Sequence, residues 1–230
     1  LGFNKLEKDT KVIVAMSGGV DSAVAAVKLK LEGYDVTGVT LRLYNQPNSS
    51  KSKSCCAGID IDDAKKVAEQ YNFPHKVFDY QDRFFNGVIS NFVDSYAEGK
   101  TPVPCIQCNQ TVKFSDLLEE SKNLNADALV TGHYAIRKGG LKESKLFKAK
   151  DKAKDQSYFL FATLQDQLDY VRFPLGNFFK SEIRRMADDY NLPVSDKPDS
   201  QDICFVTSDS YRDLINNMQP EINKEGNIFD

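Results

Sequence analysis

The sequence predicts an α/β fold, a doubly wound and mostly parallel sheet with helices on both faces. Short apolar runs at 11–16, 35–43 and 75–80 have the length of strands. Between them apolar residues recur at helical spacing, and a glycine-rich turn joins the first run to the helix that follows it. Strands that alternate with helices are typical of βαβ units, which build parallel sheets.

The same patterns place the remaining elements. Helices are expected at about 23–31, 61–71, 85–96, 114–118 and 179–190. A further strand is expected at 127–133, and alternation around Gly139-Gly140 predicts a β-hairpin or extended excursion over 137–154. Residues 44–58, rich in Ser, Asn and Lys, have the composition of a surface loop.

The domain expectation follows from these elements. Residues 1–206 are expected to form one α/β domain, with the excursion at 137–154. Residues 207–230 begin with one plausible helix and end in EGNIFD, which has the character of a strand with nothing to pair with. We therefore expect 207–230 to be the start of a further β-rich domain, with the remainder absent.

Composition limits the class of protein. No apolar run approaches the roughly 20 residues of a membrane span, and the first ten residues lack the apolar stretch of a secretion signal. Five cysteines, with Cys55 and Cys56 adjacent, argue against a disulfide framework and for a reducing compartment. We expect a cytoplasmic protein with no membrane partner. The net charge of −3 excludes a globally basic nucleic-acid coat but leaves room for a local basic patch.

The turn Ser17–Ser22, SGGVDS, lies between a predicted strand and a predicted helix. Its two glycines let the backbone turn tightly, and the helix N-terminus attracts phosphate. Ser17 and Ser22 can donate hydroxyl groups, and Asp21 suits a role in holding Mg²⁺. The alternative is an ordinary turn with an Asp or Ser N-cap. The turn lacks the lysine of a Walker loop and the third glycine of a dinucleotide fingerprint, which disfavours those two classes.

Three cysteines have spacing that indicates chemistry. Pro102 and Pro104 stiffen the approach to Cys105 and Cys108, and a helix is expected to begin there, which would lower the pKa of Cys108. Cys204 lies in a polar turn far downstream. Half of a zinc site or a redox pair are alternatives for the first two, and a small buried hydrophobe is the alternative for Cys204.

The excursion at 137–154 carries eight basic residues against two acidic ones: Arg137, Lys138, Lys142, Lys145, Lys148, Lys150, Lys152 and Lys154 against Glu143 and Asp151. Most charge runs are solvated faces. In a chain that is acidic overall, this run is better interpreted as a set of phosphate contacts.

The turn SGGVDS resembles the pyrophosphate-binding loop of ATP pyrophosphatases. The resemblance implies that residues 1–206 form an ATP-pyrophosphatase (PP-loop) domain, which binds a nucleotide. Along nearly the whole chain, several motifs in order resemble the tRNA-specific 2-thiouridine synthetases (the MnmA family). They are AMSGGVDSAVAA, TPVPCIQCNQTVKF, TGHYA at 131–135, KDQSYFL at 154–160 and DSQDICFV at 199–206. Many members have Asp where this chain has Cys105, so the chain resembles a PCxxC variant.

The resemblance implies binding roles for particular residues. ATP would be bound by Ala15, Met16, Ser17, Gly18, Gly19, Val20, Asp21, Ser22, Leu41 and Gly132. The transfer RNA would be contacted by Val103, Pro104, Cys105, His133, Lys154, Asp155 and Gln156. Mg²⁺ would accompany ATP at Asp21.

The implied reaction is ATP-dependent 2-thiolation of the wobble uridine of tRNA by a sulfurtransferase. Uridine O2 is adenylated, and sulfur then comes from a persulfide on Cys204, with Cys108 as the nucleophile. The implied partners are the anticodon region of tRNA and a persulfide-donating sulfur carrier. Alternatively, Cys105, Cys108 and Cys204 would hold an iron–sulfur cluster. Two rival functions stay open: a PP-loop amide ligase acting on a small molecule, and a non-catalytic metal- or cluster-binding module.

Overall fold

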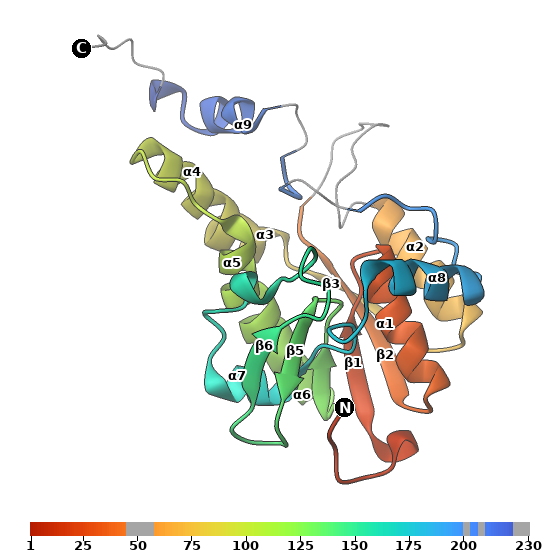
Figure 1. Cartoon of the computed structure of the whole chain (residues 1–230). Helices are drawn as coiled ribbons and strands as arrows, with labels where there is room; N and C mark the ends of the chain where they lie inside the picture. The colour runs from red at the N-terminus through yellow and green to blue at the C-terminus, as the bar shows by residue number, and fades with distance from the viewer. Residues whose placement is uncertain (45–57, 200–202, 207–209, 223–230) are drawn as a thin grey trace.

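A five-stranded parallel sheet organises the chain in the computed structural model, which describes residues 1–44, 58–199, 203–206 and 210–222. Its strands are β1 (Lys11–Ala15), β2 (Asp35–Arg42), β3 (His75–Asp79), β4 (Ala128–Val130) and β7 (Val171–Arg172). Their order is β3-β2-β1-β4-β7, and every neighbouring pair is parallel (Figure 1). The α/β fold expected from the sequence is therefore confirmed.

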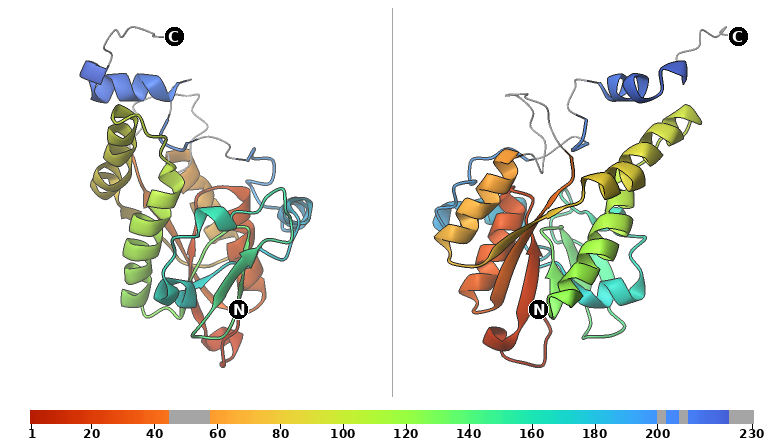
Figure 2. Two further views of the ribbon diagram at one scale, coloured as in Figure 1. Left: turned by 60° about the vertical axis from the view of Figure 1, so that its left-hand side comes forward. Right: turned by 180° about the vertical axis from the view of Figure 1, so that it is seen from behind.

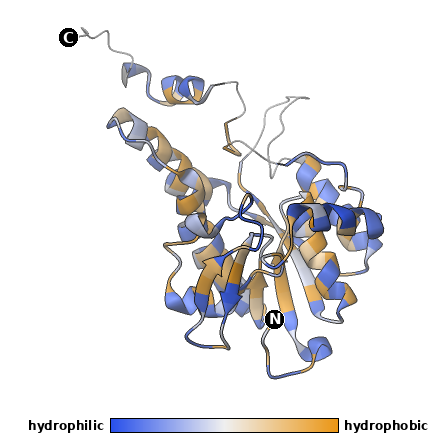
Figure 3. Ribbon diagram, in the orientation of Figure 1, coloured by the Kyte–Doolittle hydropathy of each residue, from blue (hydrophilic) through white to orange (hydrophobic). Residues whose placement is uncertain are grey.

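One face of the sheet is covered by α1 (Val20–Leu31), α2 (Gly58–Gln70) and α8 (Lys180–Asp189) (Figures 1 and 2). Helix α1 lies between the strands and α8, so it is buried along most of its length and rich in alanine and valine. Helix α8 buries Ile183 and Ala187, and Figure 3 shows it as mostly hydrophilic elsewhere. These helices confirm three of the predicted periodic segments.

The other face is covered by two long helical stretches. The first comprises α3 (Gln81–Phe84), the π-helical η2 (Phe85–Ile89) and α4 (Ser90–Ala97). The second comprises α5 (Pro104–Cys108), the π-helical η3 (Asn109–Asp116) and α6 (Leu117–Asn123). The second stretch begins ten residues earlier than the periodicity around 114–118 indicates, because Pro104 starts a helix at its first position.

The expected hairpin is present, and it is followed by two elements that the sequence patterns did not indicate. Strands β5 (Ala135–Lys138) and β6 (Lys145–Lys148) pair antiparallel. Helix α7 (Gln165–Tyr170) then leads into the two-residue strand β7. Short 3₁₀ turns lie at η1 (Glu7–Asp9), η4 (Ser157–Phe159) and η5 (Pro220–Ile222).

Helix α9 (Tyr211–Met218) confirms the helix expected after residue 206 and packs on α4. The rings of Tyr96 and Tyr211 stack with centroids 4.9 Å apart, and Gln219 donates to Asp94 over 2.6 Å. EGNIFD, Cys55, Cys56 and nearly all of the expected loop at 44–58 lie outside the described residues. Within the described part of the chain, no helix combines the length and hydrophobicity needed to cross a membrane.

Gly176 offers a test of how closely the hairpin packs on the domain. A Cβ at this position would lie 1.9 Å from the carbonyl oxygen of Ala135, whereas Gly140 has open space around it. We expect Gly176→Ala to lower the free energy of unfolding by about 1–3 kcal/mol through backbone displacement. Gly140→Ala is the matched control, with a change of at most about 0.5 kcal/mol. Urea unfolding of both variants measures the difference, and equal values would contradict the packing.

Candidate functional site

Residues Ser17–Ser22, called here the phosphate-type loop, follow the carboxyl end of β1 at the centre of the sheet. Strands β2 and β4 lie on either side of β1, so the chain order reverses direction at this point. Crevices at such switch points are where open α/β sheets bind ligands. Gly19 is the N-cap of α1, and the first N–H groups of the helix have no carbonyl partner within it. Residues 17–22 thus form a site suited to an anion.

Two glycines let other segments approach the loop. Gly18 has φ +72°, and a Cβ there would lie 2.3 Å from the carbonyl oxygen of Asp60 on α2. A Cβ on Gly132 would lie 3.0 Å from the amide nitrogen of Ser22. The loop is closed on itself by Ser22, whose Oγ accepts from the amide of Ser17 at 3.1 Å. Side chains are excluded where these three segments meet.

The strand before the loop is fixed by its neighbour β2. Ala15 is in register with Val39, and the amide of Met16 donates to the carbonyl of Val39 at 2.8 Å. Thr40 donates its hydroxyl to the carbonyl of Met16 at 2.8 Å. Leu41, the next residue of β2, is buried at the same end of the sheet. The structure therefore brings all the predicted nucleotide-binding residues to one edge of the sheet.

Lys197 ties α2 to the loop. Its ammonium group donates to the carbonyl of Gly18 at 3.0 Å and to Asp63 at 2.9 Å, and it also binds Asp60 Oδ1. Burial lowers the pKa of Lys197, but the hydrogen bonds to Asp60 and Asp63 outweigh it and leave the pKa above its ordinary value. Asp60 Oδ2 is buried with no hydrogen-bond partner in the described part of the chain. A buried carboxylate oxygen therefore lies beside the loop.

Asp21, the carboxylate of the loop, is bound by Lys180 and Tyr134. The ammonium nitrogen of Lys180 lies 2.7 and 2.8 Å from the two carboxylate oxygens of Asp21. The hydroxyl of Tyr134 donates to Asp21 Oδ1 at 2.8 Å. Burial, followed by the charge of Asp21, raises the pKa of Tyr134, so the phenol keeps its proton and acts as a donor. A residue at the start of α8 thus contacts the start of α1.

Asp199 forms ion pairs with three cations, one of which, Lys180, also contacts Asp21. Lys154 lies 2.9 Å from Oδ2, and Lys180 and Arg184 lie 2.9 and 2.5 Å from Oδ1. Burial raises the pKa of Asp199, but hydrogen bonds from Lys154, Lys180 and Arg184 outweigh it and hold the pKa well below its usual range. Lys180 is shared between Asp199 and Asp21, so one ammonium group joins the two carboxylates.

The cysteines differ in accessibility. Cys105 is exposed, Cys204 is half-buried and Cys108 is buried, and none of the three is in a disulfide. Cys108 is the last residue of α5 and lies inside a continuous helical stretch. The pKa of Cys108 is raised, and burial of the thiol is the largest cause. The expectation of a lowered pKa was therefore wrong, because desolvation disfavours the thiolate more than the charge of Lys113 favours it.

The fold packs Cys204 against the same hydrophobic cluster that contains Cys108. The carbonyl of Cys204 accepts from the hydroxyl of Tyr44 at 2.6 Å, and the ring of Phe205 lies edge-on to those of Phe84 and Phe92. Across the described ranges, no three His, Cys, Asp or Glu side chains are grouped so that they could hold a metal ion. Cys105, Cys108 and Cys204 are therefore not grouped closely enough in this structure to act together as ligands of a cluster.

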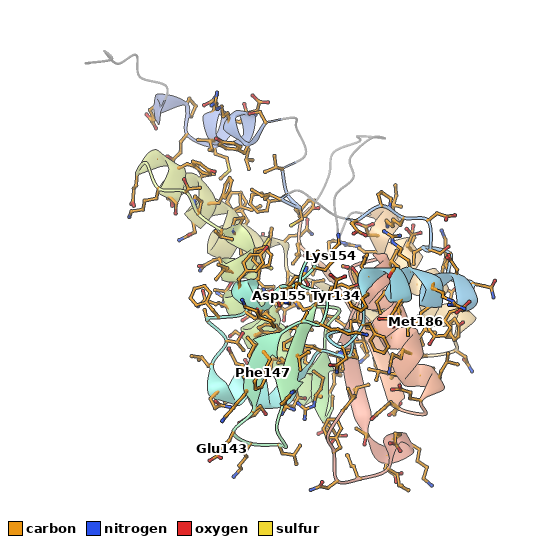
Figure 4. All side chains as sticks on the ribbon, viewed as in Figure 1. Tyr134, Glu143, Phe147, Lys154, Asp155 and Met186 are labelled. Carbon is orange, nitrogen blue, oxygen red and sulfur yellow. The ribbon has the colours of Figure 1, made fainter. Side chains whose placement is uncertain are left out.

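The residues expected to contact tRNA make internal contacts. Figure 4 shows Lys154, Asp155 and Tyr134 near one another, away from Phe147 and Glu143 on the hairpin. Asp155 accepts from the amide of Ala149 at 2.8 Å, and Gln156 Oε1 accepts from the amide of Tyr134 at 2.9 Å. Asp155 and Gln156 thus hold the excursion onto the segment that follows β4.

Two of the expected nucleic-acid contacts face inward. Arg137 donates to the carbonyls of Leu168 and Asp169 at 2.7 and 3.0 Å, so it stabilises the end of α7, and its interpretation as a phosphate contact was wrong. His133 lies between the rings of Phe114 and Phe173 at 6.1 and 6.2 Å. Burial and then the charge of Lys113 lower the pKa of His133 to about 3, which keeps the imidazole neutral.

Val103 and Pro104 line an open hollow of about 340 Å³ with Val88 and Phe92 of the first helical stretch. Val103 is exposed, whereas Pro104 is buried at the start of α5. The residues expected at the target base therefore lie at the beginning of the helix that carries Cys108.

Sequence reasoning missed Lys180, Lys197 and Tyr134 as site residues. Tyr134 lies inside the motif TGHYA, in which the sequence analysis assigned roles only to Gly132 and His133. Lys180 and Lys197 are separated from the loop by about 160 residues or more, and no spacing rule links them to it. They are found only when the sheet brings the two parts of the chain together.

The fold and this loop define a doubly wound α/β domain with a glycine-rich loop at the switch point that is suited to an anion. A family model described as the tRNA methyl transferase HUP domain matches residues 10–208. The chain belongs to this family.

Curated relatives are similar along the whole chain. The tRNA-specific 2-thiouridylase MnmA of Jannaschia sp. (strain CCS1) is 54% identical over 232 residues, covering 100% of this chain and 61% of the relative. The protein of the same name from Wolbachia pipientis subsp. Culex pipiens (strain wPip) is 54% identical over 227 residues, covering 99% of this chain and 61% of the relative. The chain therefore spans 61% of the length of each of these relatives.

Solved structures share the fold. A 4-thiouridine synthetase in complex with RNA and bound ATP has a TM-score of 0.57 at 16% identity, covering 93% of this chain and 51% of that one. The NMN synthetase from Francisella tularensis has a TM-score of 0.51 at 18% identity, covering 93% of this chain and 78% of that one. At these identities the similarity concerns the fold alone.

The cation cluster around Asp199 predicts a dependence of stability on pH. A carboxylate with a lowered pKa stabilises the fold above its unfolded pKa of about 4, and the contribution is lost as pH falls toward the folded value. We expect Asp199→Asn to lower the free energy of unfolding by about 1–3 kcal/mol at pH 7. The difference from wild type should shrink as pH falls below about 4.

Urea unfolding at several pH values measures this dependence. The control is Asp189→Asn, which removes an exposed ion pair with Arg185 on α8. Such pairs contribute about 0–1 kcal/mol, so the control should change little at any pH. A difference for Asp199→Asn that stayed constant between neutral and acidic pH would contradict the assigned ion pairs.

Proposed function

We propose that this chain is the nucleotide-binding part of an ATP-dependent sulfurtransferase that converts the wobble uridine of tRNA to 2-thiouridine. The observation that carries the proposal is the phosphate-type loop at the switch point with Cys108 and Cys204 packed against one shared cluster. The relatives named as tRNA-specific 2-thiouridylases support the same reaction, since they are 54% identical over 99–100% of the chain.

ATP fits the loop on physical grounds. Gly18 and Gly132 let Asp60 and the segment after β4 pack closely on the loop, and α1 presents its N-terminal N–H groups there. Mg²⁺ prefers carboxylate oxygens, and those beside the loop belong to Asp21 and to the unpartnered Oδ2 of Asp60. Adenylation would make uridine O2 part of a leaving group, AMP. The loop would bind and orient the pyrophosphate that this step releases.

The sulfur step is assigned to two thiols. An external persulfide carrier transfers its outer sulfur to Cys204, whose half-buried position allows access. Cys108 then attacks, as a thiolate, the inner sulfur of that persulfide, which is Sγ of Cys204; this forms a disulfide between Cys108 and Cys204 and releases hydrosulfide toward C2 of the adenylated uridine. Carbon–sulfur bond formation expels AMP, and an external reductant restores the two thiols. Because burial raises the pKa of Cys108, this step requires the thiol to lose a proton to a group brought near it.

The tRNA is assigned to the face that carries the excursion. Lys138, Lys142, Lys145, Lys148, Lys150, Lys152 and Lys154 remain as phosphate contacts once Arg137 is removed from that set, and the anticodon region would reach Val103 and Cys105. The persulfide route is proposed instead of a cluster because the described thiols and carboxylates do not assemble a set of three ligands. A cytoplasmic location accompanies this function.

Nucleotide binding is tested at two adjacent glycines. Gly18→Ala places a Cβ 2.3 Å from the backbone of Asp60 at a positive φ, whereas a Cβ at Gly19 lies 3.5 Å from Ser17 Oγ. We expect Gly18→Ala to weaken Mg-ATP binding at least about tenfold, because the loop must open, and Gly19→Ala to have a much smaller effect. Isothermal titration with Mg-ATP gives both affinities. Unchanged affinity in Gly18→Ala would remove the loop from the proposal.

The reaction is tested by its dependence on tRNA and on the thiols. Pyrophosphate release from Mg-ATP should require tRNA, whereas a small-molecule ligase would not need it. Cys108→Ser and Cys204→Ser should abolish thiolation, and Cys105→Ser should be milder, because the resemblance does not depend on Cys105. Thiouridine is measured by mass spectrometry of digested tRNA. Full thiolation by Cys204→Ser with a persulfide donor would overturn the assigned sulfur route.

A further inference from the structure

The ammonium group of Lys197 contacts the main chain of the phosphate-type loop. It donates to the carbonyl oxygen of Gly18 at 3.0 Å and to Asp63 Oδ2 at 2.9 Å, and it also binds Asp60 Oδ1. An ammonium group has three N–H donors, so these contacts use all of them. Two carboxylates already balance the charge of Lys197, so the third donor serves the loop and not the ion pair.

The main chain of Lys197 is itself fixed to α8. Its carbonyl accepts from Arg184 at 2.5 Å, and its amide donates to the carbonyl of Val194 at 3.0 Å. The side chain of Lys197 is 27% exposed and that of Asp60 is 8% exposed, so solvent screens their ion pair only in part. A lysine held at both its main chain and its ammonium group keeps the carbonyl of Gly18 in one direction.

The carbonyl of Gly18 and the N–H of Gly19 belong to one peptide group. A trans peptide is planar, and its carbonyl and N–H point in opposite directions. The contact with Lys197 therefore turns the N–H of Gly19 away from Lys197. Within the described part of the chain, no hydrogen bond uses this N–H. Gly19 is the N-cap of α1, where free N–H groups attract phosphate.

This peptide group needs a contact to hold it, because it lies between two glycines. Gly18 has φ +72° and Gly19 has φ −94°. Glycine adopts positive and negative φ about equally well, so neither residue resists rotation of the peptide between them. The rotated peptide would present its carbonyl oxygen where the N–H now lies, and an oxygen repels phosphate. The hydrogen bond from Lys197 selects the orientation that offers a donor.

We propose that Lys197 is a positioning residue for the phosphate groups of the nucleotide, which acts by holding the Gly18–Gly19 peptide with its N–H toward the anion. Lys197 does not touch the phosphate in this role. The inference rests on the proposed binding of ATP to the loop and adds a residue from the other end of the domain to that binding. It concerns the phosphates alone, so the affinity for the nucleoside does not depend on Lys197.

The peptide group can be observed directly in the wild-type protein. The chain contains two Gly-Gly pairs, Gly18-Gly19 and Gly139-Gly140. Glycine labelled with ¹⁵N and with ¹³C at its carbonyl therefore gives two signals in an NMR spectrum that correlates each amide with the preceding carbonyl. We expect saturating magnesium pyrophosphate to shift the Gly19 signal much more than the Gly140 signal, which reports on the hairpin. A Gly19 signal that does not move on binding would overturn the proposal.

Affinities measured by isothermal titration test the contact itself. Lys197→Met should weaken binding of the magnesium complex of α,β-methylene-ATP about tenfold or more, the effect of losing a charge-assisted hydrogen bond. Its affinity for adenosine should equal that of wild type, which also shows that the variant is folded. The control is Lys66→Met, because Lys66 lies 3.4 Å from Asp63 Oδ1 and contacts the same carboxylate without reaching Gly18. It should change the nucleotide affinity by about twofold at most.

Salt separates the orientation of the peptide from a general effect of charge. Interactions between charges weaken as salt is added, whereas the direction of an N–H group does not depend on ionic strength. The ratio of the wild-type and Lys197→Met affinities should therefore be kept at about 0.5 M salt. A ratio that fell to one at high salt, or an equal loss in Lys66→Met, would assign the effect to charge and overturn the positioning role.

Failure of this inference can be told apart from failure of the proposed function. If wild-type protein bound neither nucleotide nor pyrophosphate, both would fail. If it bound nucleotide and Lys197→Met bound it equally well, the inference would be overturned and the proposed function would stand. The wild-type spectrum needs no variant, so the test survives if Lys197→Met does not fold.

Discussion

The ion pair between Asp21 and Lys180 joins the first helix of the domain to the last helix on that face of the sheet. Because Lys180 also contacts Asp199, the phosphate-type loop, the start of α8 and the chain leading to Cys204 meet at one ammonium group. A partly buried charge is stable only when it is paired, so this contact fixes how these three segments are arranged. The geometry of the site follows from that arrangement.

The loop itself depends on close backbone approach. Gly18 lies against Asp60 and Gly132 against Ser22, at distances that leave no space for a Cβ. The sequence of the loop contains no lysine, yet the fold supplies Lys180 and Lys197 from the other end of the domain. Both are bound to carboxylates, so the positive charge beside the loop is balanced until an anion binds.

Sequence patterns found the parallel sheet and most helices because their apolar runs are long enough to show a period. They missed β7, since Val171 and Arg172 are too few for any period and an arginine rarely occupies a buried strand. They placed Cys108 near a helix N-terminus, where a low pKa was expected. Burial of the thiol raises the pKa instead, and burial depends on packing that spacing does not report.

The sequence by itself determined the fold class, the position of the loop after the first strand and the identity of the thiols. These depend on local spacing, since a short apolar run, a glycine pair and a periodic helix are each encoded within a few residues. Only the tertiary structure decided that Arg137 faces α7, that Cys105, Cys108 and Cys204 differ in burial, and that Lys180 joins Asp21 to Asp199. Such contacts depend on which distant residues the folded sheet brings together, because ion pairs and hydrogen bonds depend on the distance between atoms in space and not on their separation along the sequence.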